Sequence, residues 1–289
     1  MQTWFITGAS GGLAIHLTRK LLERGDRVAA TVRKAGVLDE LKHAYGDRLW
    51  SAYLDLTNAA QIEEVVTRAF TELGAVDVFV NNAAYGLYGA IEEASDAQIE
   101  HEFDTNVLGS LRAARAAMPF LRKQGHGHLV QLSSSVGHYS IPGMGLYCST
   151  KWAVEGAFEA LAKEAAPFGI RSTMVEPGGI RTGFLGGNAA YGEPMEVYRE
   201  QEAGQFTRMM KGELPGMDTP EAFNRAVVGD PEKMAQAIID RSDAGEGPLR
   251  LALGSDAYAV MRESLLARLA ALEAQKELGY STDADDIGV

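Results

Sequence analysis

Cysteine is almost absent from this sequence: Cys148 is the only one among 289 residues. A single thiol excludes a disulfide framework within the chain and a cysteine-rich zinc site. It also suits a reducing compartment, so we expect a cytoplasmic protein. Histidine offers no substitute ligand set, because His126 and His128 have no carboxylate or thiol at a metal-ligand spacing. We therefore expect no metal.

Long apolar runs and an excess of basic residues are also missing. The longest stretch without Asp, Glu, Lys or Arg, residues 124–150, is rich in Gly, Ser and His, so it is not expected to span a membrane. The first residues lack the basic and apolar regions of a signal peptide. Lys and Arg number 27 against 39 Asp and Glu, a net charge of −12 that repels phosphate backbones and anionic lipids. We expect neither nucleic acid nor a membrane as partner.

Short β-rich runs alternate with longer helical patterns along most of the chain. The expected strands are residues 4–6, 28–32, 49–54, 76–80, 129–132, 171–175 and 249–253. The expected helices are residues 13–24, 36–43, 59–73, 96–122, 147–166, 231–241 and 256–278. This alternation predicts an α/β fold: a single Rossmann-like, doubly wound parallel sheet with helices on both faces.

The sequence contains no repeat at solenoid periods and no low-complexity linker, so we expect one domain over residues 1–289. The alternation breaks at residues 183–225, which are rich in Gly, Met, Phe and Tyr and read as an insertion. The acidic tail, residues 279–289, is expected to be mobile. On the last expected helix, Leu265, Leu269 and Leu272 form an apolar stripe that we predict to pack in the core, with a subunit contact as the alternative.

Glycines cluster directly after the first expected strand, where residues 7–14 read Thr-Gly-Ala-Ser-Gly-Gly-Leu-Ala. Between a strand and a helix, such a turn lets backbone N–H groups and the helix N-terminus face a pyrophosphate. Ala14 stands where the dinucleotide fingerprint has its third small residue. The alternative is a tight turn that binds no ligand.

The end of the second expected strand reads Val32-Arg33-Lys34, about 20 residues past the glycines, where dinucleotide folds contact the adenosine ribose. No carboxylate stands there to accept hydrogen bonds from a 2′-hydroxyl. The planar fork of Arg33 suits a 2′-phosphate instead. We therefore predict NADP(H) in preference to NAD(H), with a solvated surface charge as the alternative role of Arg33.

Tyr147 and Lys151 begin an expected helix at i,i+4 spacing, which puts both side chains on one face. A nearby ammonium stabilises a phenolate and lowers the pKa of the phenol; a fall from about 10 to about 7 requires about 4 kcal/mol. An ion-pair face at the surface is the alternative. Cys148 points about 100° away from Tyr147 on such a helix, so we expect it to pack rather than react.

From residue 3 to about 182 the sequence resembles the short-chain dehydrogenase/reductase family. The family's glycine turn matches Thr7, Gly8, Gly12 and Ala14, and its acidic residue matches Asp55. Its Asn-Asn-Ala-Gly motif matches Asn81 to Ala84, and its helical asparagine matches Asn106. Its catalytic serine matches Ser134, and its Pro-Gly segment matches Pro177, Gly178 and Thr182. Ala84 replaces the last glycine of its motif. The resemblance implies the same doubly wound fold and an oxidoreductase.

The resemblance also implies roles for the catalytic residues. Tyr147 would donate a proton to a carbonyl oxygen during reduction, or remove one from an alcohol during oxidation. Ser134 would hydrogen-bond the same oxygen, Lys151 would lower the Tyr147 pKa and bind the nicotinamide ribose, and Asn106 would hold a water that relays protons to Lys151.

The cofactor residues follow from the same resemblance. Asp55 would accept a hydrogen bond from the adenine amino group, with Leu56 beside it, and residues 175–182 would bind the carboxamide. The full predicted set is Gly8, Ser10, Gly11, Gly12, Leu13, Arg33, Asp55, Leu56, Asn82, Ala83, Ala84, Tyr147, Lys151, Pro177, Gly178, Ile180 and Thr182.

The substrate is expected to be an apolar ketone, aldehyde or alcohol, because methionines and aromatics crowd residues 183–225. The alternative is that these side chains pack only against the rest of the protein. His138, Tyr139, Met144 and Phe184 flank the catalytic motifs and are the predicted substrate residues.

The leading hypothesis is an NADP(H)-dependent carbonyl reductase or alcohol dehydrogenase. The alternatives are a non-catalytic NADP(H)-sensing protein and a sugar-nucleotide epimerase or dehydratase. The glycine spacing of residues 8–14 also matches that last group. The resemblance admits a homodimer or homotetramer through the helices around Asn106 and Tyr147, and the sequence leaves the oligomeric state open.

Overall fold

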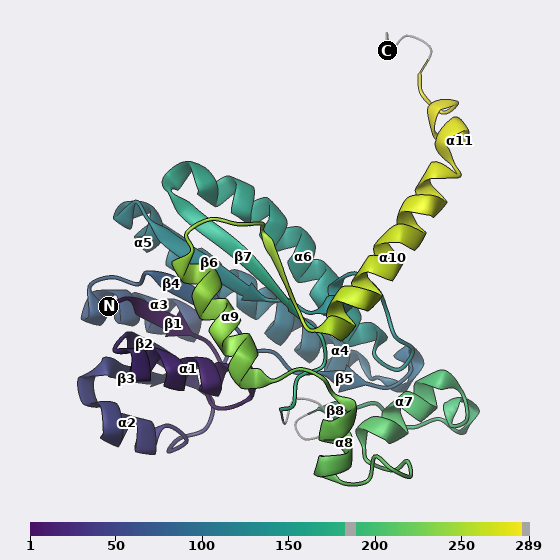
Figure 1. Cartoon of the computed structure of the whole chain (residues 1–289), viewed down its shortest axis with the longest axis horizontal. Helices are drawn as coiled ribbons and strands as arrows, with labels where there is room; N and C mark the ends of the chain where they lie inside the picture. Colours follow the sequence, from purple (N-terminus) through teal and green to yellow (C-terminus); the bar gives the residue numbers. More distant parts are fainter. Residues whose placement is uncertain (183–188, 285–289) are drawn as a thin grey trace.

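A computed structural model describes residues 1–182 and 189–284 of the chain (Figure 1). Seven parallel strands form one sheet in the order β3-β2-β1-β4-β6-β7-β9. The strands are β1 (Thr3–Ile6), β2 (Arg27–Val32), β3 (Leu49–Tyr53), β4 (Val78–Asn81), β6 (Gly127–Leu132), β7 (Ile170–Pro177) and β9 (Arg250–Leu253). The predicted α/β fold with a doubly wound parallel sheet is confirmed.

Helices connect these strands and cover both faces of the sheet (Figure 1). They are α1 (Gly12–Arg24), α2 (Asp39–Tyr45), α3 (Ala59–Leu73), α4 (Asp96–Phe103), α5 (Ser110–Gln124), α6 (Gly145–Ala165), α7 (Glu202–Met210), α8 (Pro220–Ala226), α9 (Pro231–Asp243), α10 (Ser255–Glu273) and α11 (Lys276–Tyr280). A π-helical turn, Asp104–Gly109, joins α4 to α5, so the single long helix expected over residues 96–122 is interrupted in the middle.

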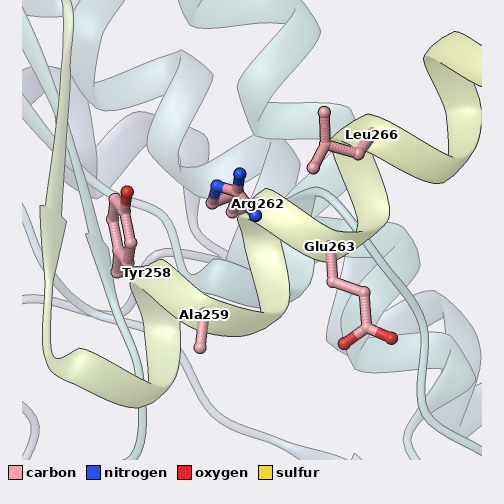
Figure 2. Close-up of a pocket in the computed structure, with 5 residues that line it drawn as sticks. All are labelled: Tyr258, Ala259, Arg262, Glu263 and Leu266. Carbon is pink, nitrogen blue, oxygen red and sulfur yellow. The ribbon is translucent and has the colours of Figure 1, made fainter.

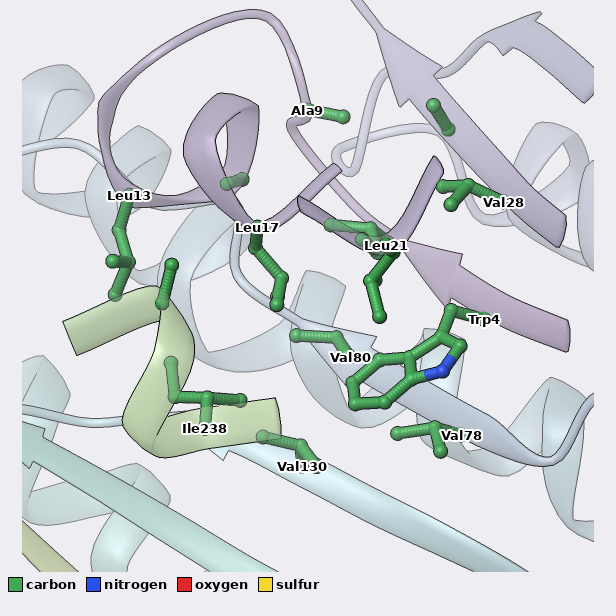
Figure 3. Close-up of a cluster of buried hydrophobic side chains, with 14 of the residues drawn as sticks. Trp4, Ala9, Leu13, Leu17, Leu21, Val28, Val78, Val80, Val130 and Ile238 are labelled. Carbon is green, nitrogen blue, oxygen red and sulfur yellow. The ribbon is translucent and has the colours of Figure 1, made fainter. Parts of the chain in front are cut away.

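Side chains alternate between the two faces along each strand. In β1, Trp4 and Ile6 face α1 and α9, where they pack with Leu17, Leu21 and Ile238 (Figure 3). Phe5 points to the other face, where α3 and α5 cover the sheet. Because both faces of the central strands are buried, these strands read as short continuous apolar runs.

The order of the strands places a topological switch point between β1 and β4. From β1 the chain winds to β2 and β3, whereas β4 continues in the opposite direction to β6, β7 and β9. In open α/β sheets, ligands bind in the crevice outside the carboxyl ends of the strands at such a point. The predicted site residues after β1, β4, β6 and β7 therefore share this edge of the sheet.

Residues 189–226, most of which belong to the predicted insertion, are connected to the rest of the fold by strand pairing. Strand β8 (Ala190–Tyr191) pairs in parallel with β5 (Leu87–Tyr88), and α7 and α8 follow it. Gln98 of α4 donates a hydrogen bond to the Tyr191 carbonyl at 2.9 Å. The strand pair and this hydrogen bond attach the segment beside α4, close to the carboxyl edge of the sheet.

The last two helices, α10 and α11, extend away from the rest of the protein (Figure 1). The prediction that the leucine stripe of this helix lies in the core is wrong: Leu265, Leu269 and Leu272 are 47%, 52% and 67% exposed. Among the described residues, no helix is both long and apolar enough to cross a membrane.

Candidate active site

The glycine turn after β1 leaves the N-terminus of α1 open. Gly8 and Gly12 have φ values of +68° and +59°, which favour glycine, and a Cβ on Gly8 would lie 2.7 Å from the Ala83 Cβ. Around Gly11 and Gly12, a Cβ would meet no atom within 4 Å. Helix α1 begins at Gly12 without a side-chain cap. Its first N–H groups are thus available to an anion.

Hydrogen bonds hold this turn against the loop that follows β4. The Thr7 hydroxyl accepts from the backbone N–H groups of Asn82 and Ala83 at 2.9 and 3.1 Å. The Asn82 amide donates to the carbonyls of Thr7 and Gly8 at 3.0 and 3.3 Å. The structure therefore brings these predicted cofactor residues together, with Ala84 next along the loop.

Other predicted cofactor residues lie around the same glycine turn. Ser10 is exposed, whereas Leu13 is buried between α1 and the sheet. Arg33 is exposed just past the end of β2. Hydrogen bonds from Thr57 hold the pKa of Asp55 below its ordinary value, and the positive charge of Arg33 lowers it further. Leu56, next to Asp55, is buried.

Asn106 lies in the π-helical turn between α4 and α5. Its amide accepts from the Tyr85 backbone N–H at 3.0 Å and donates to the Tyr85 carbonyl at 2.8 Å. It also donates to the Thr150 hydroxyl at 3.2 Å, and that hydroxyl donates to the Tyr147 carbonyl at 2.8 Å. π-Helical turns often occur at functional sites. This turn ties Asn106 to the helix that carries Tyr147 and Lys151.

Tyr147 and Lys151 lie buried on α6, with the Lys151 Nζ 5.4 Å from the centre of the Tyr147 ring. Nζ donates to the Leu132 carbonyl, at the end of β6, at 2.9 Å. Burial lowers the pKa of Lys151 to about 8. Burial also raises the pKa of Tyr147 well above 10, so the lowered phenol pKa expected from the i,i+4 spacing is not found. Desolvation of the phenol is the larger effect here.

Ser134 follows β6 and begins the 3₁₀ turn Ser135–Gly137, which packs against α6. Its hydroxyl accepts from the Val136 N–H at 3.4 Å and donates to the Pro177 carbonyl at 3.4 Å. Ser134 therefore connects the loop after β6 to the end of β7. Lys151 is bonded to Leu132, at the end of the same strand β6, and Asn106 is linked to Tyr147 through the Thr150 hydroxyl.

Sequence reasoning missed Glu102, one turn before Asn106 on α4. Its side chain is fully buried, and Oε1 accepts from the Leu87 N–H at 2.9 Å. Within residues 1–182 and 189–284, its Oε2 is buried without a hydrogen-bond partner. Burial raises the Glu102 pKa to about 7, and its charge in turn raises the pKa of Tyr147. The i,i+4 spacing from Asn106 is the sequence signal that could have identified it.

Apolar side chains surround Tyr147 in a group that we call the Tyr147 cluster. Its buried members are Tyr88, Val136, Met144, Tyr147, Cys148 and Met210, with Tyr139, Ile141, Ala189, Tyr191, Phe206 and Met209 packed against them. The rings of Tyr191 and Phe206 meet the Tyr88 ring edge-on at 5.9 and 5.6 Å. Met144 and Tyr139 thus lie near Tyr147, and Phe184 lies outside the described residues.

His138 joins a buried ionic cluster. Its Nε2 lies 3.0 Å from Glu176 Oε1, and ligand atoms of His138, Glu155 and Glu176 lie within 4.8 Å of one another. The Arg250 Nε lies 3.0 Å from Glu155 and 3.2 Å from Glu176. Because Arg250 already supplies the cation between the two carboxylates, the group is better described as an ion-pair network than as a metal site.

The other histidines singled out in the sequence differ in environment. His128 is buried, with its two ring nitrogens each 2.9 Å from a hydroxyl, of Ser242 and Thr173. Burial lowers its pKa to about 3, so the ring is neutral. His126 is exposed and lies 3.5 Å from Asp77. His128 therefore has the environment of a core residue.

The end of β7 and the loop after it carry the residues predicted to bind the nicotinamide, Pro177, Gly178, Ile180 and Thr182. Contacts with α10 fix the start of this loop. Asp256 accepts from the Gly179 N–H at 2.8 Å, and a Cβ on Gly178 would collide with the Asp256 carboxylate. Ile180 pairs with Gly229, while Thr182 is half-buried. The described part of the loop lies at the same edge of the sheet as Ser134.

The residues at this edge fit a dinucleotide. The uncapped N-terminus of α1 and the open space at Gly11 and Gly12 suit a pyrophosphate. The exposed guanidinium of Arg33 suits an additional phosphate, and Asp55 and Leu56 lie nearby in the turn after β3. The chemistry available at the edge is proton transfer, from a buried phenol flanked by an ammonium.

Comparison with known proteins identifies similar chains. The sequence model of the family described as short chain dehydrogenase matches residues 2–190. A short-chain dehydrogenase structure from Streptomyces avermitilis is 36% identical with a TM-score of 0.87, over 98% of this chain and 99% of that one. Oxidoreductase BOA17 of Botryotinia fuckeliana is 34% identical over 257 residues, 89% of this chain and 90% of its own length. A closed form of serine dehydrogenase complexed with NADP⁺ is 27% identical, with a TM-score of 0.72 over 87% of this chain and 94% of that one.

Proposed function

Because the chain belongs to the short-chain dehydrogenase family, we propose that it is an NADP(H)-dependent carbonyl reductase or alcohol dehydrogenase, built as one domain and working in the cytoplasm. The observation that carries the proposal is the linkage of Asn106, Tyr147 and Lys151, with Lys151 bonded to the Leu132 carbonyl at the end of the strand that Ser134 follows. The single cysteine supports a reducing compartment. The family is one of oxidoreductases that use a nicotinamide cofactor, whereas the specific carbonyl or alcohol reaction is our proposal.

Proton transfer is the part that this chain's own residues perform. With a pKa well above 10, the Tyr147 phenol is protonated near neutral pH, the form that donates to a carbonyl oxygen. Ser134 donates a hydrogen bond to the same oxygen and orients it. Lys151, with a pKa of about 8, is mostly an ammonium at neutral pH and stabilises the phenolate left after transfer. The nicotinamide, when bound, supplies the hydride.

The substrate is an apolar ketone or aldehyde, or the corresponding alcohol. The support is the Tyr147 cluster, in which Met144, Met210 and aromatic rings surround the phenol. Thioethers and aromatics form adaptable apolar sites that reject charged groups. The test is NADPH oxidation with pairs of ketones of equal size, one apolar and one carrying a carboxylate. Turnover confined to the apolar members supports the proposal, and equal or inverted rates contradict the substrate class.

The proposed preference for NADP(H) depends on Arg33. Replacing Arg33 with Ala should weaken NADPH affinity about 10- to 100-fold, the equivalent of a charge-assisted hydrogen-bond pair, and leave NADH affinity nearly unchanged. Fluorescence titration with both cofactors measures the two constants. Arg115→Ala, which removes an exposed arginine from α5, is the matched control. An equal loss for both cofactors, or for neither, would refute a phosphate-binding role.

A further inference from the structure

We propose that α10 and α11 are a dimerisation arm, through which two copies of this chain pair in antiparallel orientation. Every residue from Leu265 to Ala284 is exposed. The arm carries the exposed leucines Leu265, Leu266, Leu269, Leu272 and Leu278. A helical segment of this length is marginally stable in water without packing, and contiguous exposed apolar surface marks interaction sites.

Among the described residues, α10 contacts the rest of the protein mainly along one row, besides the contact of Asp256 with the loop after β7. Ala257 and Met261 are buried, the Ser264 hydroxyl donates to the His138 carbonyl at 2.8 Å, and the Arg268 guanidinium lies 4.8 Å from the Trp152 ring centre. These four residues are spaced at i, i+4, i+7 and i+11, which is one row of a helix. The helix is therefore attached along this row and through Asp256 in its first turn, and the side that carries Leu265, Leu269 and Leu272 is exposed.

Four of the exposed apolar residues form a second row, about a quarter turn from the first. Tyr258, Leu265 and Leu272 recur every seven residues with Leu269 between them, which is the spacing of a coiled-coil seam. Tyr258, Arg262, Ala259, Glu263 and Leu266 line a surface depression on the same helix (Figure 2). In Figure 2, Tyr258, Arg262 and Leu266 project from one side of α10, with Glu263 on another.

The charges beside this seam favour a second copy in antiparallel orientation. In a pair centred between Ala267 and Arg268, Arg262 of one copy lies opposite Glu273 of the other, and Leu266 lies opposite Leu269. Two-fold symmetry repeats both contacts, so two ion pairs flank the leucines. A parallel pair would instead place Arg262 opposite Arg262 and Glu273 opposite Glu273, which repel.

A lipid surface fits the arm less well than a second copy. Residues 265–284 hold Arg268 and Lys276 against Glu273, Glu277 and Asp283, so they lack the basic face of helices that bind anionic membranes. The net charge of the chain, −12, adds repulsion from such a surface. The self-complementary charges beside the leucine seam have no function in lipid binding.

The first test is the mass of the full chain by size-exclusion chromatography with light scattering. Leu269→Glu should halve the mass of the wild-type assembly, whereas Ala267→Glu, the same charge on the opposite side of α10, should leave it unchanged. Circular dichroism of both variants checks that the fold is retained. A monomeric wild type, or equal masses for the wild type and Leu269→Glu, would overturn the proposal.

Charge reversal tests the antiparallel register. Arg262→Glu and Glu273→Arg should each raise the dissociation constant about tenfold, and their combination should restore it. Additive weakening in the double variant would overturn the register. Co-sedimentation of the wild type with phosphatidylcholine vesicles, lost in Leu269→Glu, would overturn the second copy in favour of a lipid surface.

Discussion

Replacing Tyr147 with Phe is expected to lower kcat by about 10³-fold or more and to leave NADPH affinity within about twofold of the wild type. The phenol is the proton donor of the proposed reaction, and a positioned general acid contributes about 10²- to 10⁴-fold. The substitution removes one oxygen and keeps the ring, so contacts within the Tyr147 cluster remain. Steady-state rates with an apolar ketone and a direct NADPH titration separate the two effects.

The matched control is Tyr53→Phe, which removes the hydroxyl from a tyrosine that is 55% exposed on β3. It should keep wild-type turnover. Retention of more than about a tenth of the activity in Tyr147→Phe would show that another group supplies the proton. Loss of both turnover and NADPH binding would show instead that the hydroxyl maintains the site's structure.

Replacing Glu102 with Gln is expected to flatten the pH dependence of stability. The Glu102 carboxyl has a pKa of about 7 in the folded chain and about 4.5 when unfolded, so the folded state binds the proton more tightly. Its contribution to stability is therefore greatest at low pH and is lost as pH rises between these values. From about pH 5 to about pH 8 this loss is roughly 2 to 3 kcal/mol, and Glu102→Gln should abolish it.

Urea unfolding of wild type and variant at the two pH values measures this difference. Glu100→Gln, an exposed change on the same helix α4, should keep the wild-type pH dependence. Parallel pH profiles for wild type and Glu102→Gln would mean that the Glu102 carboxyl is ionised without penalty in the folded chain, through a partner for Oε2.

The sequence predicts the sheet and the arrangement of the edge residues well because both follow from local patterns. Strands buried on both faces read as apolar runs, and the loops after β1, β4, β6 and β7 carry Gly8, Asn82, Ser134 and Gly178. In a parallel sheet these loops must share one edge. Chain order alone therefore places the candidate site at this edge, although it does not give the role of any residue there.

Two features of the fold depend on tertiary contacts that periodicity does not record. The strands β5 and β8 have two residues each, too few for an alternating pattern, and they form through pairing across a hundred residues of chain. The seam residues Leu265, Leu269 and Leu272 have the spacing of a buried stripe, but the first turns of α10 attach through a different row, at Ala257 and Met261. Spacing reveals an apolar face and not what covers it.

The electrostatics of the site are a third feature beyond the sequence. Spacing predicts that Lys151 is one turn from Tyr147, which the structure bears out, but the pKa of the phenol also depends on its burial. In the part of the chain that the structure describes, Glu102 Oε2 is left without a partner because the β5 backbone bonds only Oε1. Both effects are set by desolvation, which requires the packed structure.

The measurement that tests the central claim most directly is transfer of deuterium from NADPH that carries deuterium at both hydrogens of the nicotinamide C4. An apolar ketone is incubated with the full chain, and the product alcohol is analysed by mass spectrometry. We predict an alcohol that carries one deuterium at the carbinol carbon, formed in equal amount to the NADP⁺ released. Turnover without net consumption of the labelled cofactor, or binding of NADPH with no labelled product from any ketone or aldehyde supplied, would contradict the assignment as a carbonyl reductase.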